Sequence, residues 1–365
     1  MSLHLQNIDH IVGGEAHISE LSLELEPGSF NVLLGRTLAG KTTLMRLMAG
    51  LEQPSRGKIF MDGKDVTGVS VRKRNVSMVY QQFINYPSLS VYDNIASPLK
   101  LAKASRQEID KRVRETAEML GIDHLLDRLP LELSGGQQQR TAMGRALVKD
   151  ADLILFDEPL VNLDYKLREA LRDELRDLFK ARNCIAVYAT TEPNEALALG
   201  GNTAVLHEGK LLQYGPTEQV YREPNGILSA EMFSEPPINI VPGHLTDNEI
   251  TFDQDIHFPC DEALRNLPAG EYRFGVRASH VSLKPNAADD LELDVEVEVA
   301  EISGSETFLH VRHKLFPLVL HLLGIHTPGV NQRINVYFPT HKLFVFDQRG
   351  NIVHTPETRG GAHHV

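Results

Sequence analysis

The sequence predicts an α/β domain built on a parallel sheet, followed by a smaller all-β domain. Two observations predict the first domain. A glycine-rich loop, Gly35–Thr43, lies between an apolar strand and a helical pattern, and the apolar run Leu153–Phe156 ends in two acidic residues. The second domain is predicted by the alternation of apolar and mostly acidic residues over 291–300. At 365 residues the chain is long enough to bury more than one core.

The glycine-rich loop, GRTLAGKTT, fits the G-x-x-x-x-G-K-[ST] pattern of a phosphate-binding loop. Small residues let successive backbone N–H groups curl around an anion, and the helix that follows adds a favourable dipole. Lys41 can reach the β and γ oxygens of a nucleotide, and the Thr42 hydroxyl can ligate Mg²⁺. A chance glycine turn is the alternative for this loop taken alone. The candidate nucleotide-binding residues are Gly35, Arg36, Thr37, Leu38, Ala39, Gly40, Lys41, Thr42 and Thr43.

The two acids after the buried run 153–156 are candidates for metal binding and catalysis. In a doubly wound sheet, ligands bind at the carboxyl ends of the strands. We therefore expect Asp157 to face a metal ion and Glu158 to orient or deprotonate water. A solvated acidic turn is the alternative, which the neighbouring Pro159 and the apolar run disfavour.

A second glycine-rich segment, LSGGQ at Leu133–Gln137, begins another predicted helix. A Ser-Gly-Gly turn at a helix start can bind an anion, but one nucleotide needs only one such cradle, so the surplus implies a partner chain. An ordinary glycine-rich helix cap is the alternative for this segment alone. With these three motifs the chain resembles the ATP-binding cassette (ABC) family. It is most similar to the ATPase subunits of carbohydrate and polyol importers, including glycerol-type importers.

The resemblance implies an α/β P-loop NTPase cassette with a helical signature subdomain at about 85–150. A smaller all-β OB-like barrel, the TOBE domain, would follow. It also implies that ATP and Mg²⁺ bind and that two cassettes pack head to tail. Each nucleotide would then lie between one subunit's lysine loop and the other subunit's signature. Gln81 would touch Mg²⁺ and the attacking water, and Asp164 would face the opposite subunit. The signature residues that would contact the partner's nucleotide are Ser134, Gly135, Gly136 and Gln137.

The segment 83–95 is similar to the family's socket for the coupling helix of a membrane subunit, and a plain loop with a helix start is the alternative.

Two positions depart from the family pattern. Thr191 stands in the slot of a histidine, and threonine cannot carry positive charge or relay a proton near neutral pH. Val12 stands in the slot of an aromatic residue that stacks on adenine. We therefore expect slow hydrolysis and weaker nucleotide binding at the chain's own site.

The leading hypothesis is an ATPase that energises import of a polyol, sugar or sugar-phosphate-like solute. Because Glu158 argues against a dead site, we expect one half of an asymmetric pair of two related ATPases. Further partners would be two membrane-spanning permease subunits and, through them, a periplasmic or extracellular solute-binding protein. Three alternatives stay open: a homodimer, a nearly non-catalytic ATP-binding scaffold, and a cassette ATPase that acts on DNA or ribosomes. The short interval between Lys41 and Ser134, without heptads, disfavours the last of these.

Composition agrees with a subunit at the cytoplasmic face of the bacterial membrane. The net charge of -12 disfavours nucleic acid as a partner, and the only two cysteines, Cys184 and Cys260, are too few for a disulfide framework. No segment has the apolar length of a membrane-spanning helix.

The predicted boundary near residue 235 gives domains 1–235 and 236–365. In the second domain, Arg277, His280 and Phe308 are candidates for a regulatory pocket, with ordinary strand residues as the alternative.

Overall fold

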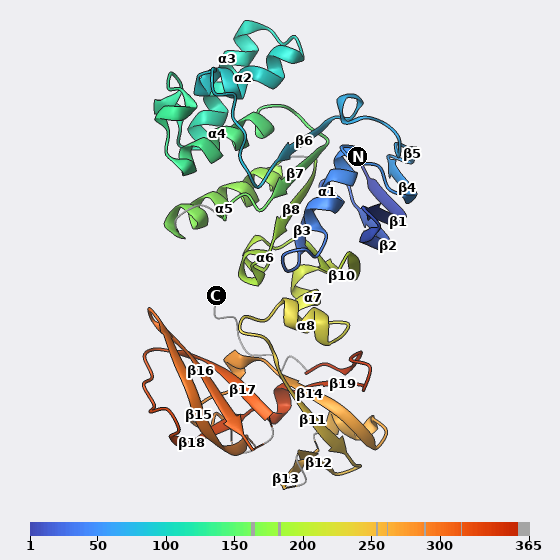
Figure 1. Ribbon diagram of the computed structural model, residues 1–365, viewed down its shortest axis with the longest axis vertical. Coiled ribbons are helices and arrows are strands. Elements are labelled where there is room, and N and C mark those ends of the chain that lie inside the picture. The colour runs from blue at the N-terminus through green and yellow to red at the C-terminus, as the bar shows by residue number, and fades with distance from the viewer. Residues whose placement is uncertain are drawn as a thin grey trace. The chain divides into compact units, whose positions relative to one another are not determined.

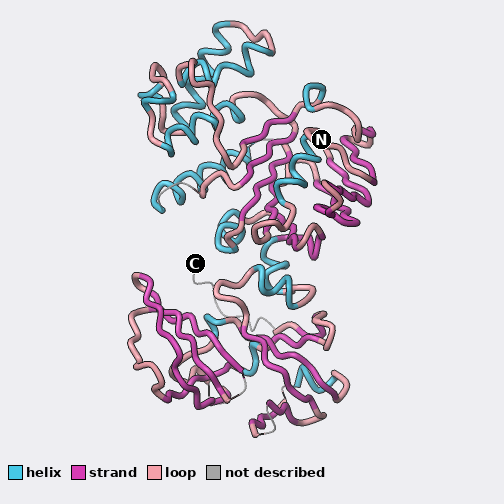
Figure 2. Tube along the Cα trace, viewed as in Figure 1, coloured by secondary structure: helices cyan, strands magenta, loops and turns pink. Residues whose placement is uncertain are grey.

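The computed structural model describes residues 1–161, 165–181, 184–252, 255–260, 262–287, 290–314 and 316–356 (Figure 1). The chain divides into two compact units, Met1–Glu218 and Gln219–Val365. Helices and strands alternate in the first unit, whereas strands dominate the second (Figure 2). Among the described residues, no helix combines the length and the apolar character needed to cross a membrane.

The central sheet of the first unit has the strand order β10-β9-β3-β8-β7-β6. All of its neighbouring pairs are parallel except β10 with β9. Every residue of β7 and β8 is buried, which explains why both strands are apolar up to their last residues, Asp157 and Thr190. The strands are β3 (Phe30–Leu34), β6 (Val76–Val79), β7 (Leu153–Asp157), β8 (Ile185–Thr190), β9 (Asn202–His207) and β10 (Lys210–Pro216).

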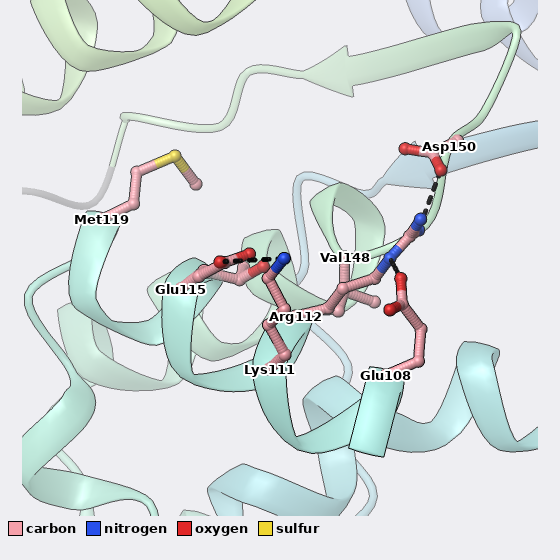
Figure 3. A pocket seen from close by; sticks show the side chains of 8 residues that line it. Glu108, Lys111, Arg112, Glu115, Met119, Val148 and Asp150 are labelled. Carbon is pink, nitrogen blue, oxygen red and sulfur yellow. Dashed lines mark hydrogen bonds and ion pairs between the residues drawn. The ribbon is translucent and has the colours of Figure 1, made fainter. Parts of the chain in front are cut away.

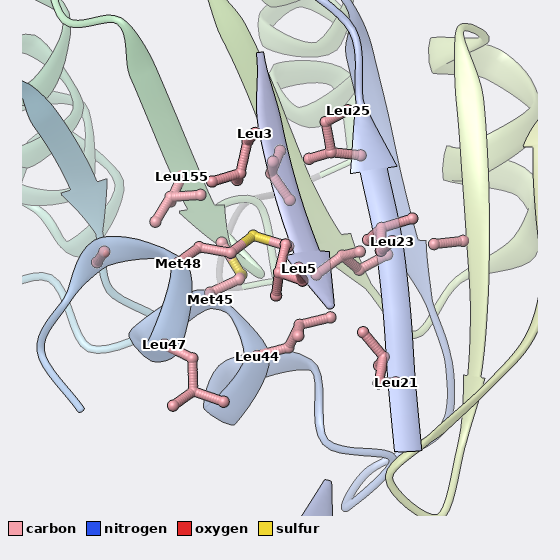
Figure 4. Close-up of a cluster of buried hydrophobic side chains, with 14 of the residues drawn as sticks. Leu3, Leu5, Leu21, Leu23, Leu25, Leu44, Met45, Leu47, Met48 and Leu155 are labelled. Carbon is pink, nitrogen blue, oxygen red and sulfur yellow. The ribbon is translucent and has the colours of Figure 1, made fainter. Parts of the chain in front are cut away.

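An antiparallel sheet of order β2-β1-β4-β5 packs on the other side of helix α1 (Lys41–Ala49). Alternate residues of its strands point at the helix, because successive side chains of a strand face opposite sides. Leu5 and Leu23 thus meet Leu44 and Met48 in a buried cluster that also reaches Leu155 of β7 (Figure 4). The cluster fixes α1, and with it the loop that precedes α1, against both sheets. The strands are β1 (Leu3–Val12), β2 (Glu15–Leu25), β4 (Arg56–Met61) and β5 (Lys64–Asp65).

Three helices form a separate group in the first unit: α2 (Val91–Leu101), α3 (Arg106–Met119) and α4 (Gly135–Leu147) (Figure 1). Each begins at a serine whose hydroxyl accepts a hydrogen bond from the first turn, which is a favourable helix start. The group falls within the range expected for the helical subdomain. The remaining α-helices are α5 (Tyr165–Ala181), α6 (Pro193–Leu199), α7 (Thr217–Arg222) and α8 (Ile227–Met232).

The second unit contains two antiparallel sheets, ordered β13-β12-β11-β14-β19-β20 and β17-β16-β15-β18. The alternation that predicted β15 is observed: Leu293, Val295 and Val297 are buried, and the acids between them face away from the core. The strands are β11 (Asn239–Leu245), β12 (Glu249–Phe252), β13 (Ile256–Pro259), β14 (Gly270–Val276), β15 (Leu291–Ser303), β16 (Glu306–His313), β17 (Phe316–Leu323), β18 (Arg333–Phe338), β19 (Phe344–Phe346) and β20 (Ile352–His354). The predicted fold class, a P-loop cassette followed by an OB-like β domain, is confirmed.

The structural division lies at 218/219, whereas the sequence placed the boundary near residue 235. Residues 219–235 associate with the β unit through a buried cluster of Ala230 with Ile238, Phe344 and Phe346, through backbone hydrogen bonds at Asn225 and Ile227, and through Arg277. Its guanidinium donates to the carbonyl oxygens of Tyr221 at 2.6 Å and Phe233 at 3.4 Å. The limits 1–235 for the nucleotide-binding domain and 236–365 for the β-barrel domain stay a prediction.

Candidate functional site

Three segments leave the central sheet at the same edge. The register pairs Leu34 of β3 with Thr190 of β8, and Asp157 of β7 with Ala189 of β8. Two backbone hydrogen bonds continue this alignment beyond the strands, from Gly35 N to Thr190 O at 3.3 Å and from Glu158 N to Ala189 O at 3.2 Å. The glycine-rich loop, the two acids and the segment that starts at Thr191 therefore meet at the carboxyl ends of parallel strands, where ligands bind in such sheets.

The glycine-rich loop curls tightly in front of α1. A Cβ on Gly35 would lie 2.5 Å from the carbonyl oxygen of Leu206, and Gly40 has a φ of 98°, so both positions require glycine. Lys41 is the first residue of α1, and its ammonium donates to the carbonyl oxygens of Gly35 at 2.7 Å and Arg36 at 3.2 Å. The loop thus presents backbone N–H groups at a helix N-terminus with a lysine beside them, which is the arrangement that binds phosphates.

Glu158 connects the glycine-rich loop to Gln81. One carboxylate oxygen lies 3.2 Å from the Lys41 ammonium, and the other accepts a hydrogen bond of 3.0 Å from the Gln81 side-chain amide. The Glu158 backbone has a φ of 48°, a conformation that costs a non-glycine residue of order 1–3 kcal/mol and that tends to occur at functional sites. The structure therefore brings together Lys41, Gln81 and Glu158, which the sequence assigned to one site.

Asp157 and Thr42 form a second pair beside this network. The Thr42 hydroxyl lies 3.0 and 2.9 Å from the two carboxylate oxygens of Asp157, and Asp157 is only 2% exposed. Burial raises the pKa of the Asp157 carboxyl. A hydroxyl and a carboxylate supply the hard oxygen ligands that Mg²⁺ prefers when phosphates complete its shell, so these residues fit the ion. No cluster of three or more His, Cys, Asp or Glu side chains able to hold a metal occurs among the described residues.

Asp157→Asn is expected to raise the melting temperature of the Mg²⁺-free protein. Because the folded-state pKa of this carboxyl lies above its usual value, folding opposes its ionisation. This loss of folding stability is complete at a pH above the folded-state pKa and disappears at a pH below the unfolded-state pKa. The amide of asparagine does not ionise, so the variant does not lose this stability. The same substitution should remove most of the stabilisation by Mg²⁺-ATP. Thermal melts of both proteins with and without Mg²⁺-ATP test this, and a lower melting temperature for the Mg²⁺-free variant would contradict it.

A cleft of about 610 Å³ opens over the glycine-rich loop. It contains the loop residues 37–43 together with Gln81 and Glu158. Sequence reasoning missed five of its lining residues, Glu15, Ala16, His17, Glu208 and Gly209. Only Gly209 carries a local signal, because a Cβ there would lie 2.5 Å from the carbonyl oxygen of His17. The others reach the cleft through the β1-β2 hairpin and the β9-β10 turn, which no motif marks.

Val12 and Thr191 lie close to this cleft but are not among its described lining residues. Val12 is 47% exposed and pairs with Glu15 across the hairpin that borders the cleft. Thr191 follows β8 and is half-buried. The preceding hydroxyl, that of Thr190, is buried and donates to Glu195 at 2.6 Å, so it is already engaged.

The LSGGQ segment forms the start of α4 as predicted. The Ser134 hydroxyl accepts a hydrogen bond from Gln137 N at 3.4 Å, and the Gln137 side chain accepts one from Ser134 N at 2.9 Å. None of the residues Ser134, Gly135, Gly136 and Gln137 is among those that line the described cleft, and Ser134 and Gly135 are exposed. This chain therefore does not place its own signature in its own loop cleft. Asp164 lies outside the described residues.

A second hollow, of about 350 Å³, lies on α3 (Figure 3). Its central cation, Arg112, is paired with Glu108 and, at 2.8 Å, with Asp150. Lys111 lies 4.0 Å from Glu115 on the same helix. Because these charges are paired with one another, the hollow provides no catalytic group comparable to those of the first cleft.

The fold and the cleft define a P-loop protein that binds a nucleoside triphosphate. The family model described as ABC transporter matches residues 18–161. The chain is 37% identical to the trehalose/maltose import ATP-binding protein MalK of Thermococcus litoralis, over 95% of this chain and 97% of the relative. It is 36% identical to the xylose/arabinose import ATP-binding protein XacJ of Haloferax volcanii, over 96% of this chain and 95% of the relative.

A third relative is the sn-glycerol-3-phosphate import ATP-binding protein UgpC of Escherichia coli, with 35% identity over 90% of this chain and 93% of the relative. A solved dimeric structure of the ATP-binding cassette MJ0796 bound to ADP and Pi superposes with a TM-score of 0.54 and 26% identity. It covers 59% of this chain and 98% of that chain. The chain belongs to the ATP-binding proteins of ABC transporters, and its cassette binds ATP with Mg²⁺.

Proposed function

We propose that this chain is the ATPase subunit that energises import of a polyol, sugar or sugar-phosphate-like solute, glycerol included. The observation that carries the proposal is the convergence of Lys41, Gln81 and Glu158 at one cleft in a chain similar to import ATPases over nearly its whole length. Three relatives named for different solutes are about equally similar. These similarities therefore support a class of transported solutes rather than a single solute.

The residues of the cleft have complementary roles in this proposal. Backbone N–H groups of the loop and the Lys41 ammonium bind the phosphates. Thr42, Asp157 and Gln81 would hold Mg²⁺, which would supply charge neutralisation at the phosphate oxygens. Glu158 orients the attacking water and accepts its proton. Since Lys41 pairs with Glu158 in this structure, binding phosphate through Lys41 also releases the carboxylate that acts on water.

The chain's own site is slow in this proposal because Thr191 provides no cation at the γ-phosphate. Removing one preorganised contact to a transition state costs about 2.7–4 kcal/mol, or roughly 10²–10³ in rate. The two acidic residues of the site, Asp157 and Glu158, are retained. A site that binds and positions ATP but lacks one charged contact is consistent with the weaker half of a pair.

The proposed partner is a second, non-identical ABC ATPase that supplies a complete site. The capped start of α4 leaves Ser134 and Gly135 exposed, and the signature lies outside the chain's own cleft, so it is available to a neighbouring nucleotide. In the head-to-tail arrangement, this signature would complete the partner's faster site. A nearly non-catalytic scaffold is a weaker proposal, because such a role would not require the Lys41–Glu158–Gln81 network.

The segment after Gln81 is proposed to contact a membrane-spanning permease at the cytoplasmic face of the membrane. Ile84 is 61% exposed and Tyr86 48% exposed, so the segment offers apolar side chains to a partner. It is also tied to the signature helix, because the Asn85 amide donates to Gln138 O at 2.8 Å and the Arg145 guanidinium lies 5.0 Å from the centre of the Tyr86 ring. A permease that moves this segment could thus affect both Gln81 and α4.

Val12→Tyr is expected to tighten ATP binding by the isolated chain. Stacking of a base on an aromatic ring is worth about 1–3 kcal/mol, or roughly 5–150-fold in Kd. A fluorescent ATP analogue titrated into each protein measures the change. Ile11→Tyr is the matched control, because Ile11 is 54% exposed and its side chain leaves the opposite face of the same strand. Equal effects of the two substitutions would contradict the assignment of Val12 to the base.

Reconstitution with the permease and the solute-binding protein tests the proposed function directly. ATP hydrolysis by the assembly in liposomes should rise when solute-loaded binding protein is added, and labelled solute should accumulate inside. Lys41→Ala in this chain should reduce both. Hydrolysis that never responds to permease or solute would count against an import function.

A further inference from the structure

The segment that follows β8 carries an acidic side chain next to the glycine-rich loop. Thr190 is the last residue of β8, and Thr191 and Glu192 connect the strand to α6. The connection starts beside the loop, because Thr190 O accepts the hydrogen bond from Gly35 N. A carboxylate at this place repels a nucleoside triphosphate, since both are negatively charged. Unless Glu192 is neutralised or directed elsewhere, it therefore opposes ATP binding.

Glu192 is held by Arg168 of α5. The Nη1 atom of the Arg168 guanidinium donates to both carboxylate oxygens of Glu192, at 2.9 and 3.1 Å. The Arg168 side chain is 24% exposed and the Glu192 side chain is 43% exposed. An ion pair so accessible to water contributes little to folding stability. We therefore look for its effect at the nucleotide site.

The backbone at Glu192 directs the carboxylate toward α5. Glu192 is the residue before the first turn of α6, with a φ of -96° and a ψ of 115°, and its side chain makes no capping hydrogen bond. In extended backbone of this kind, successive side chains leave opposite sides of the chain. Thr191 and Glu192 therefore point in different directions, so Thr191 can face a nucleotide while Glu192 contacts Arg168.

Hydroxyl groups fix the backbone of the same segment. The Thr190 hydroxyl accepts a hydrogen bond from Glu192 N at 3.0 Å and donates to the Glu195 carboxylate at 2.6 Å. The Tyr188 hydroxyl donates to the same oxygen of Glu195 at 3.2 Å. Glu195 is buried, so these two hydroxyls provide the hydrogen bonds that a buried carboxylate requires. Loss of Arg168 should therefore release the Glu192 side chain without releasing the segment.

We propose that Arg168 is a positioning residue for ATP binding, and that it acts by holding the Glu192 carboxylate away from the γ-phosphate. The inference rests on the proposed function, which places the γ-phosphate beside Thr191. ADP has no γ-phosphate, so a released Glu192 side chain would oppose ATP more strongly than ADP. The Arg168–Glu192 pair thus determines how well the chain's own site distinguishes the triphosphate from the diphosphate.

The experiment is a titration of fluorescent ATP and ADP analogues, each with Mg²⁺, into the full chain. The test variants are Arg168→Met, Glu192→Gln and the double variant with both substitutions. Methionine keeps much of the aliphatic length of arginine but has no charge. Arg176→Met is the matched control, because Arg176 also lies on α5 and reaches α6, where it donates to Ala198 O at 3.5 Å.

We expect Arg168→Met to weaken ATP binding roughly tenfold, the effect of one released like charge near the γ-phosphate, and to leave ADP binding unchanged. The loss should shrink at high salt, which screens exposed charges. The double variant should regain the ATP affinity of the parent, because an amide does not repel phosphate. Glu192→Gln alone should bind ATP at least as tightly as the parent, since it removes the acid and keeps the cation. Arg176→Met should bind both nucleotides as the parent does.

Equal losses for ATP and ADP in Arg168→Met would show a general packing role and overturn the inference. A double variant that binds ATP no better than Arg168→Met would overturn it as well, and so would an equal loss in Arg176→Met. If Arg168→Met fails to fold, Glu192→Gln decides alone, and weaker ATP binding there would contradict the inference. The proposed function is tested separately by Thr191→His. Faster hydrolysis in that variant, together with unchanged ATP affinity in Arg168→Met, would remove only the role of the ion pair.

Discussion

Thr191→His is expected to raise ATP hydrolysis by the assembled transporter's weaker site by roughly 10²–10³. Thr191 leaves β8 next to both Gly35 and Glu158, because Thr190 O and Ala189 O accept hydrogen bonds from their backbone N–H groups. A histidine side chain at this position can place an imidazolium or a neutral N–H donor at the γ-phosphate. Single-turnover hydrolysis of radiolabelled ATP by the purified chain and by the assembly measures the effect.

The control for this substitution is Thr191→Asn, which offers a hydrogen bond but no titratable group. It should hydrolyse ATP at the rate of the parent. If Thr191→His gave no increase in either the isolated chain or the assembly, the missing histidine would not be what limits turnover. A comparable rise in Thr191→Asn would show that geometry rather than charge is limiting.

Glu158→Gln is expected to reduce single-turnover hydrolysis by roughly 10²–10⁴, the usual contribution of a general base. Glutamine can still hydrogen-bond Gln81 but cannot accept a proton from water. It also removes the ion pair of 3.2 Å with Lys41, so ATP should bind at least as tightly as in the parent. The combination of retained binding and lost hydrolysis separates this effect from unfolding.

Asp152→Asn is the matched control for Glu158→Gln. Asp152 directly precedes β7, so it lies at the strand end opposite to Glu158 and is exposed. Its substitution should leave hydrolysis unchanged. Hydrolysis by Glu158→Gln at the parental rate would remove Glu158 from the proposed mechanism and assign water activation to another group.

Much of the nucleotide site is predictable because its signals are local. The glycine-rich loop needs glycine at Gly35 and Gly40 for steric reasons that any sequence with this loop must satisfy. The acids Asp157 and Glu158 mark the end of a fully buried strand, and their place at the sheet edge follows from the parallel topology. The pairing of Glu158 with Lys41 depends on tertiary contacts and could not be read from spacing.

Two other features depend on contacts distant in sequence. Glu15 and His17 enter the cleft because the β1-β2 hairpin folds over the loop, and neither residue has a motif around it. The division at 218/219 depends in part on Arg277, which binds the carbonyl oxygen of Tyr221, 56 positions earlier in the chain. The Pro-rich break near residue 235 is a clear local signal, but the contacts of Arg277 and the buried cluster around Ala230 override it in the packing.

The sequence predicts that the LSGGQ segment begins a helix, but it does not predict the complete site to which the segment contributes. Local chemistry explains the capping of α4 by Ser134 and Gln137. A site completed by two chains depends on residues of the second chain, which this sequence does not contain. The identity of that chain is therefore the central question of the proposed function.

Native mass spectrometry of the transporter purified through a tag on this chain tests the central claim most directly. An asymmetric pair predicts an assembly with one copy of this chain, one copy of a different ABC ATPase of distinct mass, and two permease subunits. An assembly with two copies of this chain and no other ATPase, hydrolysing ATP at a rate that Thr191→His does not increase, would contradict the account.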